Sequence, residues 1–353
     1  MPLEKEYPIA GPVTAAGASQ ITANALAASA GVPGAINAIS PNAKTYFVAF
    51  DGTGNNKYDL NKPPTNVTAL FNAADAGLTV TDSGIAKYYQ GAGTQSNSVS
   101  ASVDGLLGTS VLATASQAYK EFVSWAQDQY SSNPNVEITL AGASFSRGGG
   151  THTAFLNEVW NKGVPNPDYP NDPREFLISP KTANLGVNVF FDRVLQGIRS
   201  DATELLPDAP LSKFRALEFI AQDEHRREFI GDPLNSQNNS DQRVLSLYSP
   251  GDHSDIGKGH FQTGIGLYTL DGAYKYLSAS GLPLAALSAD LAPGSLPLEI
   301  HDSFKGFWGS SGGPYLASWI EDRTSALYYK NNPVPGVDTG INPNYMPLPA
   351  ELE

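Results

Sequence analysis

The chain has 353 residues, of which 41% are hydrophobic and 10% aromatic; this excludes a disordered protein and allows a large buried core. Its 22 basic and 35 acidic residues give a net charge of −13, which disfavours binding to nucleic acid. It has no cysteine, so disulfides, thiolate nucleophiles and cysteine-based metal sites are excluded. We find no transmembrane segment of about 20 apolar residues and no secretory signal in Met1–Gly11. We therefore expect a soluble protein, cytoplasmic in the producing cell or exported without a signal peptide.

The predicted elements begin after residue 42. Residues 1–42 are rich in small residues and interrupted by prolines, so we expect a loosely ordered arm. Beyond it, apolar β-rich runs alternate with helical patterns. The expected strands are residues 44–50, 85–90, 135–142, 186–192, 214–221 and 243–248, and the expected helices are 66–74, 103–130 and 152–162.

These strands are continuous apolar runs, which predict an α/β-hydrolase-like fold: a mostly parallel sheet with helices on both faces. We assign residues 43–353 to one such domain. Loop insertions are expected at about 163–182 and 231–241, and a C-terminal helical or cap elaboration at about 263–353.

Residues 136–150 combine a strand, a turn of small residues and the start of a helix. This layout is typical of a nucleophile elbow, in which a serine lies on a tight strand-to-helix turn with its hydroxyl exposed. Small residues are needed two positions before and after the nucleophile. The frame Ser144–Gly148 therefore favours Ser146 over Ser144. The alternative is a glycine- and serine-rich turn that binds a phosphate or nothing, although the P-loop ending is absent.

A serine nucleophile needs a base, and the chain has five histidines. His253 lies in a turn directly after the strand 243–248, where α/β-hydrolases carry this residue. Asp192 ends the strand 186–192 and is the candidate acid, with a helix N-cap as its alternative role. His301 is an alternative base, whereas His152 and His260 are expected to be structural.

Six motifs in this order resemble the DUF2235 family, the Tle1-like phospholipase group that includes type VI secretion lipase effectors. They are Asp51-Gly-Thr-Gly-Asn-Asn56, Tyr89-Gln-Gly-Ala-Gly-Thr94, Ser144-Phe-Ser-Arg-Gly148, Phe191-Asp192, Asp223-Glu-His-Arg-Arg227 and Pro250-Gly-Asp-His-Ser-Asp-Ile-Gly257. The resemblance implies Ser146 as nucleophile, Asp192 as acid and His253 as base. This chain departs from the family at Ser144, where the family has glycine, and at Arg193, where it usually has threonine.

The mechanism implied is acyl transfer, with His253 taking the Ser146 proton and Asp192 orienting the imidazole. We expect the oxyanion to be bound by the backbone N–H of Arg147 and by one in the turn that holds Thr53 and Gly54. Two further carboxylates are expected to support the site. Asp51 would brace the elbow loop, and Asp255 would hydrogen-bond the backbone of the His253 loop. We expect the mixed-charge residues 223–227 to form ion pairs.

The leading hypothesis is a serine hydrolase of the phospholipase A type, acting on a phospholipid or another acyl ester. As a type VI effector it would have an immunity protein as partner. The alternatives are an esterase on soluble or polymeric esters, favoured by the charge of −13, and a catalytically silent hydrolase fold used for binding. We expect no cofactor and no metal, because no spacing matches an EF-hand or a zinc motif, although a loop calcium stays open.

Overall fold

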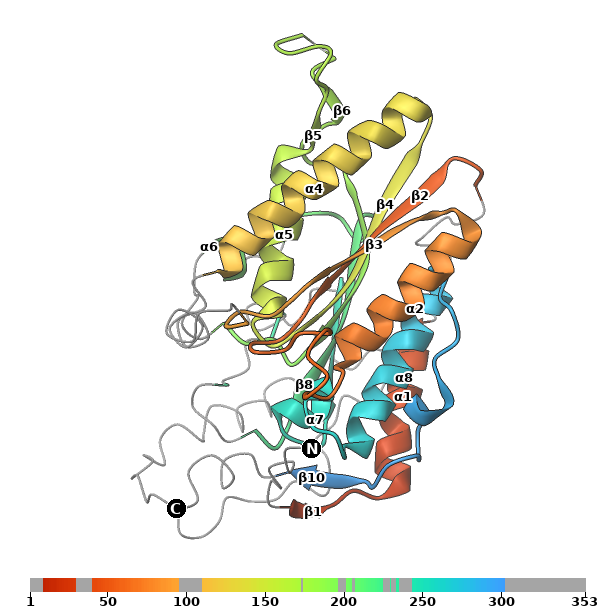
Figure 1. Ribbon diagram of the computed structural model, residues 1–353, viewed down its shortest axis with the longest axis vertical. Helices are drawn as coiled ribbons and strands as arrows, with labels where there is room; N and C mark the ends of the chain where they lie inside the picture. Colours follow the sequence, from red (N-terminus) through yellow and green to blue (C-terminus); the bar gives the residue numbers. More distant parts are fainter. Residues whose placement is uncertain are drawn as a thin grey trace.

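A six-stranded parallel sheet forms the centre of the computed structural model, with the strand order β3-β2-β4-β7-β8-β9 (Figure 1). The structure describes residues 9–29, 40–94, 110–172, 174–195, 201–204, 207–224, 229, 233–234 and 243–301. The strands are β2 (Ala43–Phe50), β3 (Gly84–Tyr89), β4 (Glu137–Phe145), β7 (Asn184–Phe191), β8 (Phe214–Ala221) and β9 (Val244–Ser249). The predicted parallel α/β-hydrolase-like fold is confirmed.

Helices cover both faces of this sheet, as Figure 1 shows. One face carries α4 (Val111–Ser132), α5 (Gly148–Lys162) and the short α6 (Asp201–Glu204), and the other carries α1 (Ala15–Ser29), α2 (Asn66–Thr81) and α8 (Gly264–Ala279). Each face has its own apolar core. Because neighbouring residues of a strand point to opposite faces, the central strands are apolar on both sides and read as continuous runs. In β7, for example, every residue from Leu185 to Phe191 is buried.

The expectation of a loosely ordered N-terminal arm is wrong for residues 15–29, which form α1. The prolines that suggested disorder lie outside this stretch. Its small residues let α1 approach α8 closely: a Cβ added to Gly272 would lie 2.8 Å from the Cβ of Ala25. The arm is also tied down by β1 (Ile9–Pro12), which pairs antiparallel with β10 (Glu299–His301).

Several element boundaries differ from those expected. The strand β4 continues three residues beyond 142, and α2 continues beyond 74 to Thr81, where Asp82 ends it in a left-handed conformation. The expected loop insertion at 163–182 contains a small hairpin of β5 (Val164–Pro165) and β6 (Phe176–Ile178). Within the C-terminal elaboration, α8, a 3₁₀ turn (Ala289–Leu291) and β10 are described. Residues 103–109, most of 231–241 and residues 302–353 lie outside the described residues.

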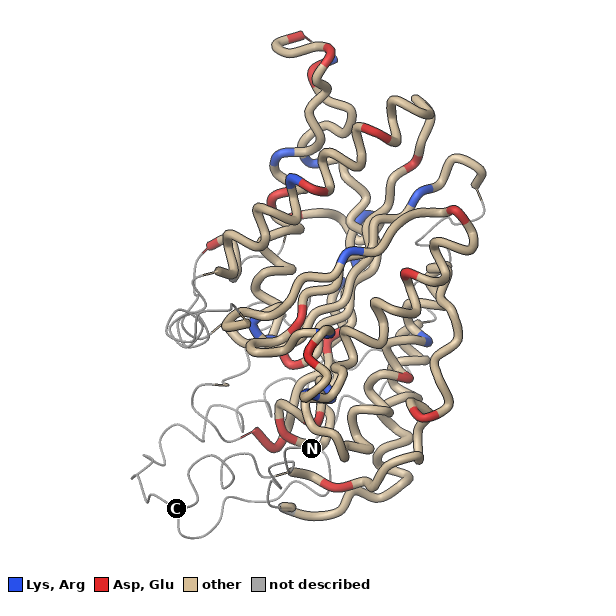
Figure 2. The backbone as a smooth tube through the Cα atoms, in the orientation of Figure 1, with Lys and Arg blue, Asp and Glu red and all other residues tan. Residues whose placement is uncertain are grey.

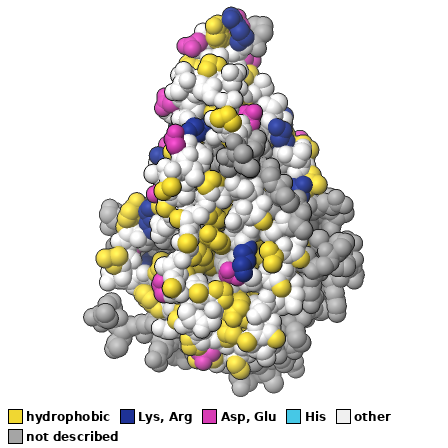
Figure 3. All heavy atoms as spheres, turned by 90° about the vertical axis from the view of Figure 1, so that its right-hand side faces the viewer, with side chains coloured by type: hydrophobic (Ala, Val, Ile, Leu, Met, Phe, Trp, Pro, Cys, Tyr) yellow, Lys and Arg dark blue, Asp and Glu magenta, His cyan; other side chains and the backbone are white. Residues whose placement is uncertain are grey.

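Charged side chains are sparse on this fold. Lys and Arg are interspersed with Asp and Glu along the described chain, as Figure 2 shows. On the face formed by α2 and α8, Figure 3 shows apolar atoms gathered over the lower half, with few charged groups between them. None of the described helices is both long and apolar enough to cross a membrane.

Candidate active site

The strand register brings the expected catalytic residues to one edge of the sheet. Phe50 of β2 lies opposite Ser144 of β4, and Phe145 of β4 lies opposite Phe191 of β7. Because these strands are parallel, their carboxyl ends coincide. The residues that follow them directly, Asp51, Ser146 and Asp192, therefore emerge side by side.

Ser146 has the backbone conformation of a nucleophile elbow. Its φ is 57°, in the left-handed region that side-chain-bearing residues rarely adopt, and α5 begins two residues later. Its N–H donates to the Phe191 carbonyl at 3.1 Å, and its own carbonyl accepts from the N–H groups of Gly149 and Val194. These bonds to β7 and to the following helix hold the turn in its strained shape.

The glycine two residues after Ser146 is required by close packing. A Cβ on Gly148 would lie 2.3 Å from the carbonyl oxygen of Phe50 and 2.6 Å from that of Asp51. Both oxygens belong to the backbone and cannot move aside as a flexible side chain would. The elbow is therefore pressed directly against the end of β2.

Ser144, the first departure from the family pattern, is accommodated by a buried hydrogen-bond network. Its hydroxyl lies 3.1 Å from Nδ1 of His152, whose Nε2 lies 3.0 Å from Oδ1 of Asn188. Burial lowers the pKa of His152 to about 3, so the imidazole is neutral. His152 thus links α5 to Ser144 in β4 and Asn188 in β7. Ser146 keeps its left-handed conformation with this network next to it.

Arg193, the second departure, is also buried. Its guanidinium donates to the Thr203 carbonyl, and its aliphatic part packs against Gly149, where an added Cβ would lie 2.8 Å from the arginine Cγ. The side chain thus lies against the first turn of α5 and reaches α6. Asp192 itself has a φ of 39°.

The expected acid and base are in contact. His253 Nδ1 lies 2.7 Å from Asp192 Oδ2, and Asp192 Oδ1 accepts the backbone N–H of Ala221 at 2.8 Å. Both side chains are almost fully buried, with exposed fractions of 3% and 1%. The imidazole stacks on Phe145, the residue before Ser146, with ring centroids 4.6 Å apart. Among the described residues, the Ser146 hydroxyl forms no hydrogen bond.

Four carboxylates hold the loop of His253, and only one of them, Asp255, is predicted from the sequence as a site residue. His253 is the first residue of the short helix α7 (His253–Gly257), whose N-terminus is capped by a capping box between Asp252 and Asp255. Glu224 Oε2 accepts the His253 N–H at 3.2 Å, and Asp223 Oδ2 accepts the Gly251 N–H at 2.7 Å. The motif at 223–227 is the sequence signal for Glu224 and Asp223, and these two carboxylates accept backbone N–H groups in addition to any ion pairs. Residues 225–227 lie outside the described residues.

Asp255 bonds the His253 loop, as expected, and also engages the alternative base. Its Oδ2 accepts the N–H of Asp252 at 3.1 Å, and its Oδ1 lies 2.6 Å from Nδ1 of His301. His301 is thus held by a carboxylate of α7. His260 lies beside it, with the two ring centroids 4.5 Å apart.

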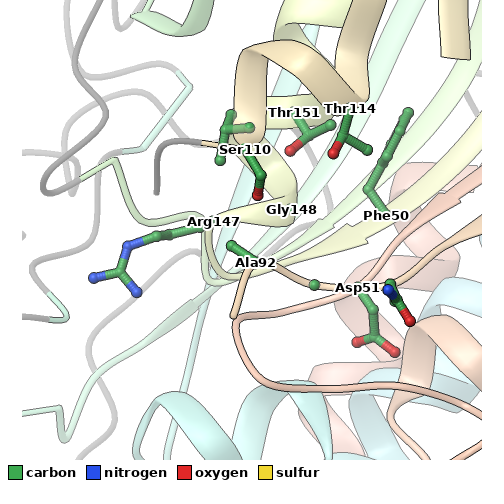
Figure 4. A pocket seen from close by; sticks show the side chains of 11 residues that line it. Phe50, Asp51, Ala92, Ser110, Thr114, Arg147, Gly148 and Thr151 are labelled. Atoms are coloured by element: carbon green, nitrogen blue, oxygen red, sulfur yellow. The ribbon is translucent and has the colours of Figure 1, made fainter. Parts of the chain in front are cut away.

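Asp51 braces the turn after β2. Its buried carboxylate accepts from the Gly52 N–H at 2.8 Å, from the Thr65 hydroxyl at 2.9 Å and from the Tyr88 hydroxyl at 2.7 Å. Burial raises the pKa of Asp51, and these hydrogen bonds oppose that rise. The carboxylate points down toward α2 in Figure 4, so it supports the turn from below.

The turn that was expected to complete the oxyanion hole offers one of its two candidate donors. The N–H of Gly54 is donated to the Ala92 carbonyl at 2.7 Å, so the expectation for Gly54 is wrong in this structure. The N–H of Thr53 forms no hydrogen bond among the described residues. Nη1 of Arg147 donates to the Thr53 hydroxyl at 3.0 Å, which ties the turn to the residue after Ser146. Figure 4 shows the Arg147 side chain turned away from Ser110 and Thr114.

Part of the chain matches a known protein family. Residues 44–164 match the family of type VI secretion phospholipase effectors called Tle1-like, over its catalytic domain. The matched segment contains the turn after β2, β3 and the Ser146 elbow. It confirms, over this segment, the resemblance given by the sequence motifs. No curated protein matches the chain.

Solved structures resemble this chain at low sequence identity. An uncharacterized protein from Pseudomonas aeruginosa is 19% identical with a TM-score of 0.50, covering 91% of this chain and 57% of its own. A Tle1 effector bound to the VgrG spike of a Type 6 secretion system is 17% identical with a TM-score of 0.37, covering 62% and 52%. An acetylxylan esterase is 16% identical with a TM-score of 0.30, covering 69% and 99%. This chain therefore spans just over half the length of the first two proteins.

Proposed function

We propose that this protein is a serine carboxylic-ester hydrolase of the phospholipase A type, with Ser146, Asp192 and His253 as its catalytic triad. The observation that carries the proposal is the buried hydrogen bond of 2.7 Å between His253 and Asp192, at the sheet edge where Ser146 occupies a left-handed elbow. A carboxylate at Nδ1 keeps the proton on that nitrogen and leaves Nε2 as the base.

In the proposed reaction, His253 Nε2 takes the Ser146 proton as the hydroxyl oxygen attacks the ester carbonyl. Asp192 stabilises the imidazolium, which then gives its proton to the leaving alcohol as the carbon–oxygen bond breaks. A water molecule then attacks the carbonyl of the acyl-enzyme while His253 takes its proton, and the acid product leaves as the Ser146 oxygen regains a proton from His253. Hydrogen bonds of this kind commonly tighten only when substrate is bound, which accounts for a Ser146 hydroxyl without a partner among the described residues.

The negative oxygen of the intermediate needs two donors, which we assign to the backbone N–H groups of Arg147 and Thr53. The second assignment rests on the hydrogen bonds of the turn: Gly52 and Gly54 donate their N–H groups to Asp51 and Ala92, and Thr53 does not donate to a described residue. Loss of one such donor typically costs about 3 to 4 kcal/mol of transition-state stabilisation.

A lipid substrate is supported by the family match and by the loop that follows the oxyanion turn. This loop carries Tyr58 and Leu60, whose exposed fractions of 74% and 93% are unusual for large apolar side chains. The net charge of −13 opposes binding to an anionic surface and favours the second candidate, an esterase on soluble esters. Under the first proposal, the substrate is a zwitterionic phospholipid.

The test is product analysis by mass spectrometry with phosphatidylcholine vesicles, phosphatidylglycerol vesicles and a soluble acyl ester. We expect release of fatty acid and lysophospholipid from phosphatidylcholine, and none with Ser146→Ala. The matched control is Ser132→Ala, at the exposed end of α4, which should behave as wild type. Hydrolysis of the soluble ester alone would favour the second candidate. Labelling of Ser146 by a fluorophosphonate excludes the catalytically silent fold, and failure of labelling would refute the triad.

We further propose delivery by a type VI system and neutralisation by an immunity protein, on the strength of the family match over residues 44–164. Co-purification of the chain with the spike protein and with the product of an adjacent gene tests both parts. An immunity protein must also inhibit the hydrolysis described above. Absence of both complexes would restrict the proposal to the enzyme itself.

A further inference from the structure

Four ligand-type side chains converge beneath the His253 helix, outside the proposed triad. They are Asp252 and Asp255 of the α7 cap, His260 from the turn before α8, and His301 at the end of β10. All four are buried, with exposed fractions between 0% and 7%. One donor atom from each of Asp255, His260 and His301 lies within 4.8 Å of the others. The fourth, Asp252 Oδ2, lies 3.6 Å from His260 Nε2.

The charge of this cluster favours a cation. Two carboxylates three residues apart are buried together, and their mutual repulsion and burial must be offset. Asp255 accepts from two backbone N–H groups and from the His301 imidazole, and no lysine or arginine pairs with it among the described residues. A bound divalent cation would offset the buried negative charge of Asp255.

We propose that Asp252, Asp255, His260 and His301 bind one divalent transition-metal ion, with zinc as the best fit. Two imidazoles and two carboxylates suit zinc, whereas calcium and magnesium prefer sites made of oxygen ligands alone. Nothing in the spacing of these residues along the chain resembles a zinc motif. Folding brings them together from three separate segments.

Two of the distances between ligand atoms lie within about 0.7 Å of those that a tetrahedral ion requires. With zinc–ligand bonds of about 2.0 to 2.1 Å, neighbouring ligand atoms lie about 3.3 Å apart. The Asp252–His260 pair, at 3.6 Å, is already near this value. The Asp255–His301 pair, at 2.6 Å, is joined by a hydrogen bond whose proton a metal ion would displace, and the two atoms must move apart by about 0.7 Å. Zinc replaces that proton, which is released to water.

The position of the site gives it a structural task. The ion would join α7, whose first residue is His253, to β10, which pairs with the N-terminal strand β1. It would thus fix the loop of the proposed base without touching the reacting atoms. The binding itself does not depend on the proposed function, so the two can fail separately.

The experiment uses the full chain, stripped with a chelator, dialysed and then titrated with zinc. We expect one zinc per chain by elemental mass spectrometry after desalting, a sub-micromolar dissociation constant and a raised melting temperature. Cobalt in place of zinc should give the intense visible absorption of a four-coordinate site. A hundredfold excess of calcium should displace neither ion.

Substitutions identify the ligands. His301→Asn and His260→Asn should each weaken zinc binding by more than about 100-fold. Mutation of a residue that only hydrogen-bonds a metal ligand commonly lowers the metal affinity about 10- to 100-fold, and the loss of a ligand itself should cost more. The matched control is His253→Asn. It removes an imidazole from α7, the helix that carries Asp255, but no proposed ligand, so the variant should retain one zinc per chain. Wild-type protein without stoichiometric zinc, or His301→Asn with unchanged affinity, would overturn the proposal. If a variant does not fold, a cobalt spectrum of the wild type without four-coordinate absorption overturns it instead.

Discussion

The substitution Asp192→Asn tests the triad while changing almost no volume. In the wild type, one carboxylate oxygen accepts the Ala221 N–H at 2.8 Å and the other meets His253 Nδ1 at 2.7 Å. An asparagine has only one oxygen. If that oxygen keeps the bond to Ala221, the amide NH₂ faces Nδ1 and forces the imidazole proton onto Nε2, so the base can no longer take the Ser146 proton.

The opposite orientation of the amide is costly. It would set the NH₂ group against the Ala221 N–H, and a buried donor left without an acceptor costs about 1 to 3 kcal/mol. The unproductive tautomer therefore dominates, and the charge that stabilised the imidazolium is gone as well. For a triad we expect kcat to fall by about 10⁴-fold, equivalent to roughly 5.5 kcal/mol of activation free energy.

The assay compares kcat on a soluble acyl ester, the rate of fluorophosphonate labelling and the melting temperature. Asp128→Asn, an exposed position on α4, serves as the matched control and should match the wild type in all three. Asp192→Asn should melt near the wild-type temperature. A folded Asp192→Asn variant that keeps more than a tenth of the wild-type kcat would refute the assignment of the acid.

Two further predictions concern the elbow. Gly148→Ala places a Cβ 2.3 Å from the Phe50 carbonyl oxygen, so we expect it to lower the free energy of unfolding by about 1 to 3 kcal/mol and to reduce labelling of Ser146. Gly17→Ala in α1 is the control and should do neither. Denaturant titration measures the stability, and a Gly148→Ala variant as stable as the wild type would contradict the prediction. Burial lowers the pKa of His152 to about 3, against 6.5 in the unfolded chain. The neutral, buried imidazole therefore contributes its full stabilisation above pH 6.5. Below that pH the free energy of unfolding falls by up to about 1.4 kcal/mol per pH unit, until about pH 3. His152→Gln should remove this dependence, so a stability difference between the two proteins that stays constant from about pH 7 to pH 4 would count against it.

The sequence predicted the sheet well because its strands are buried on both faces and carry a strong apolar signal. It predicted α1 wrongly, because a helix of small residues has little periodicity of its own and is stabilised by close contact with α8. The same limit applies to helix ends. Asp82 ends α2 in a left-handed conformation, and because this residue is not a glycine, the sequence does not indicate the helix end.

The positions of the proposed triad could be predicted because each of them follows a recognisable strand. Their supporting groups could not, since Glu224 and Asp223 act on the backbone of a loop about 30 residues further along the chain. Hydrogen bonds to backbone N–H groups leave no pattern in the sequence of the residues that donate them. The loss of Gly54 as a donor has the same cause, because its partner Ala92 belongs to the loop after β3.

The parallel register also governs where this chain tolerates engineering. A strand advances about 3.3 Å per residue and alternates its faces, so deleting one residue from β4 would draw Ser146 back by that distance and turn it to the other side of the sheet. The hairpin of β5 and β6 lies at the far end of the molecule in Figure 1, away from α7. A reporter or affinity domain inserted at the tip of that hairpin leaves every strand length unchanged.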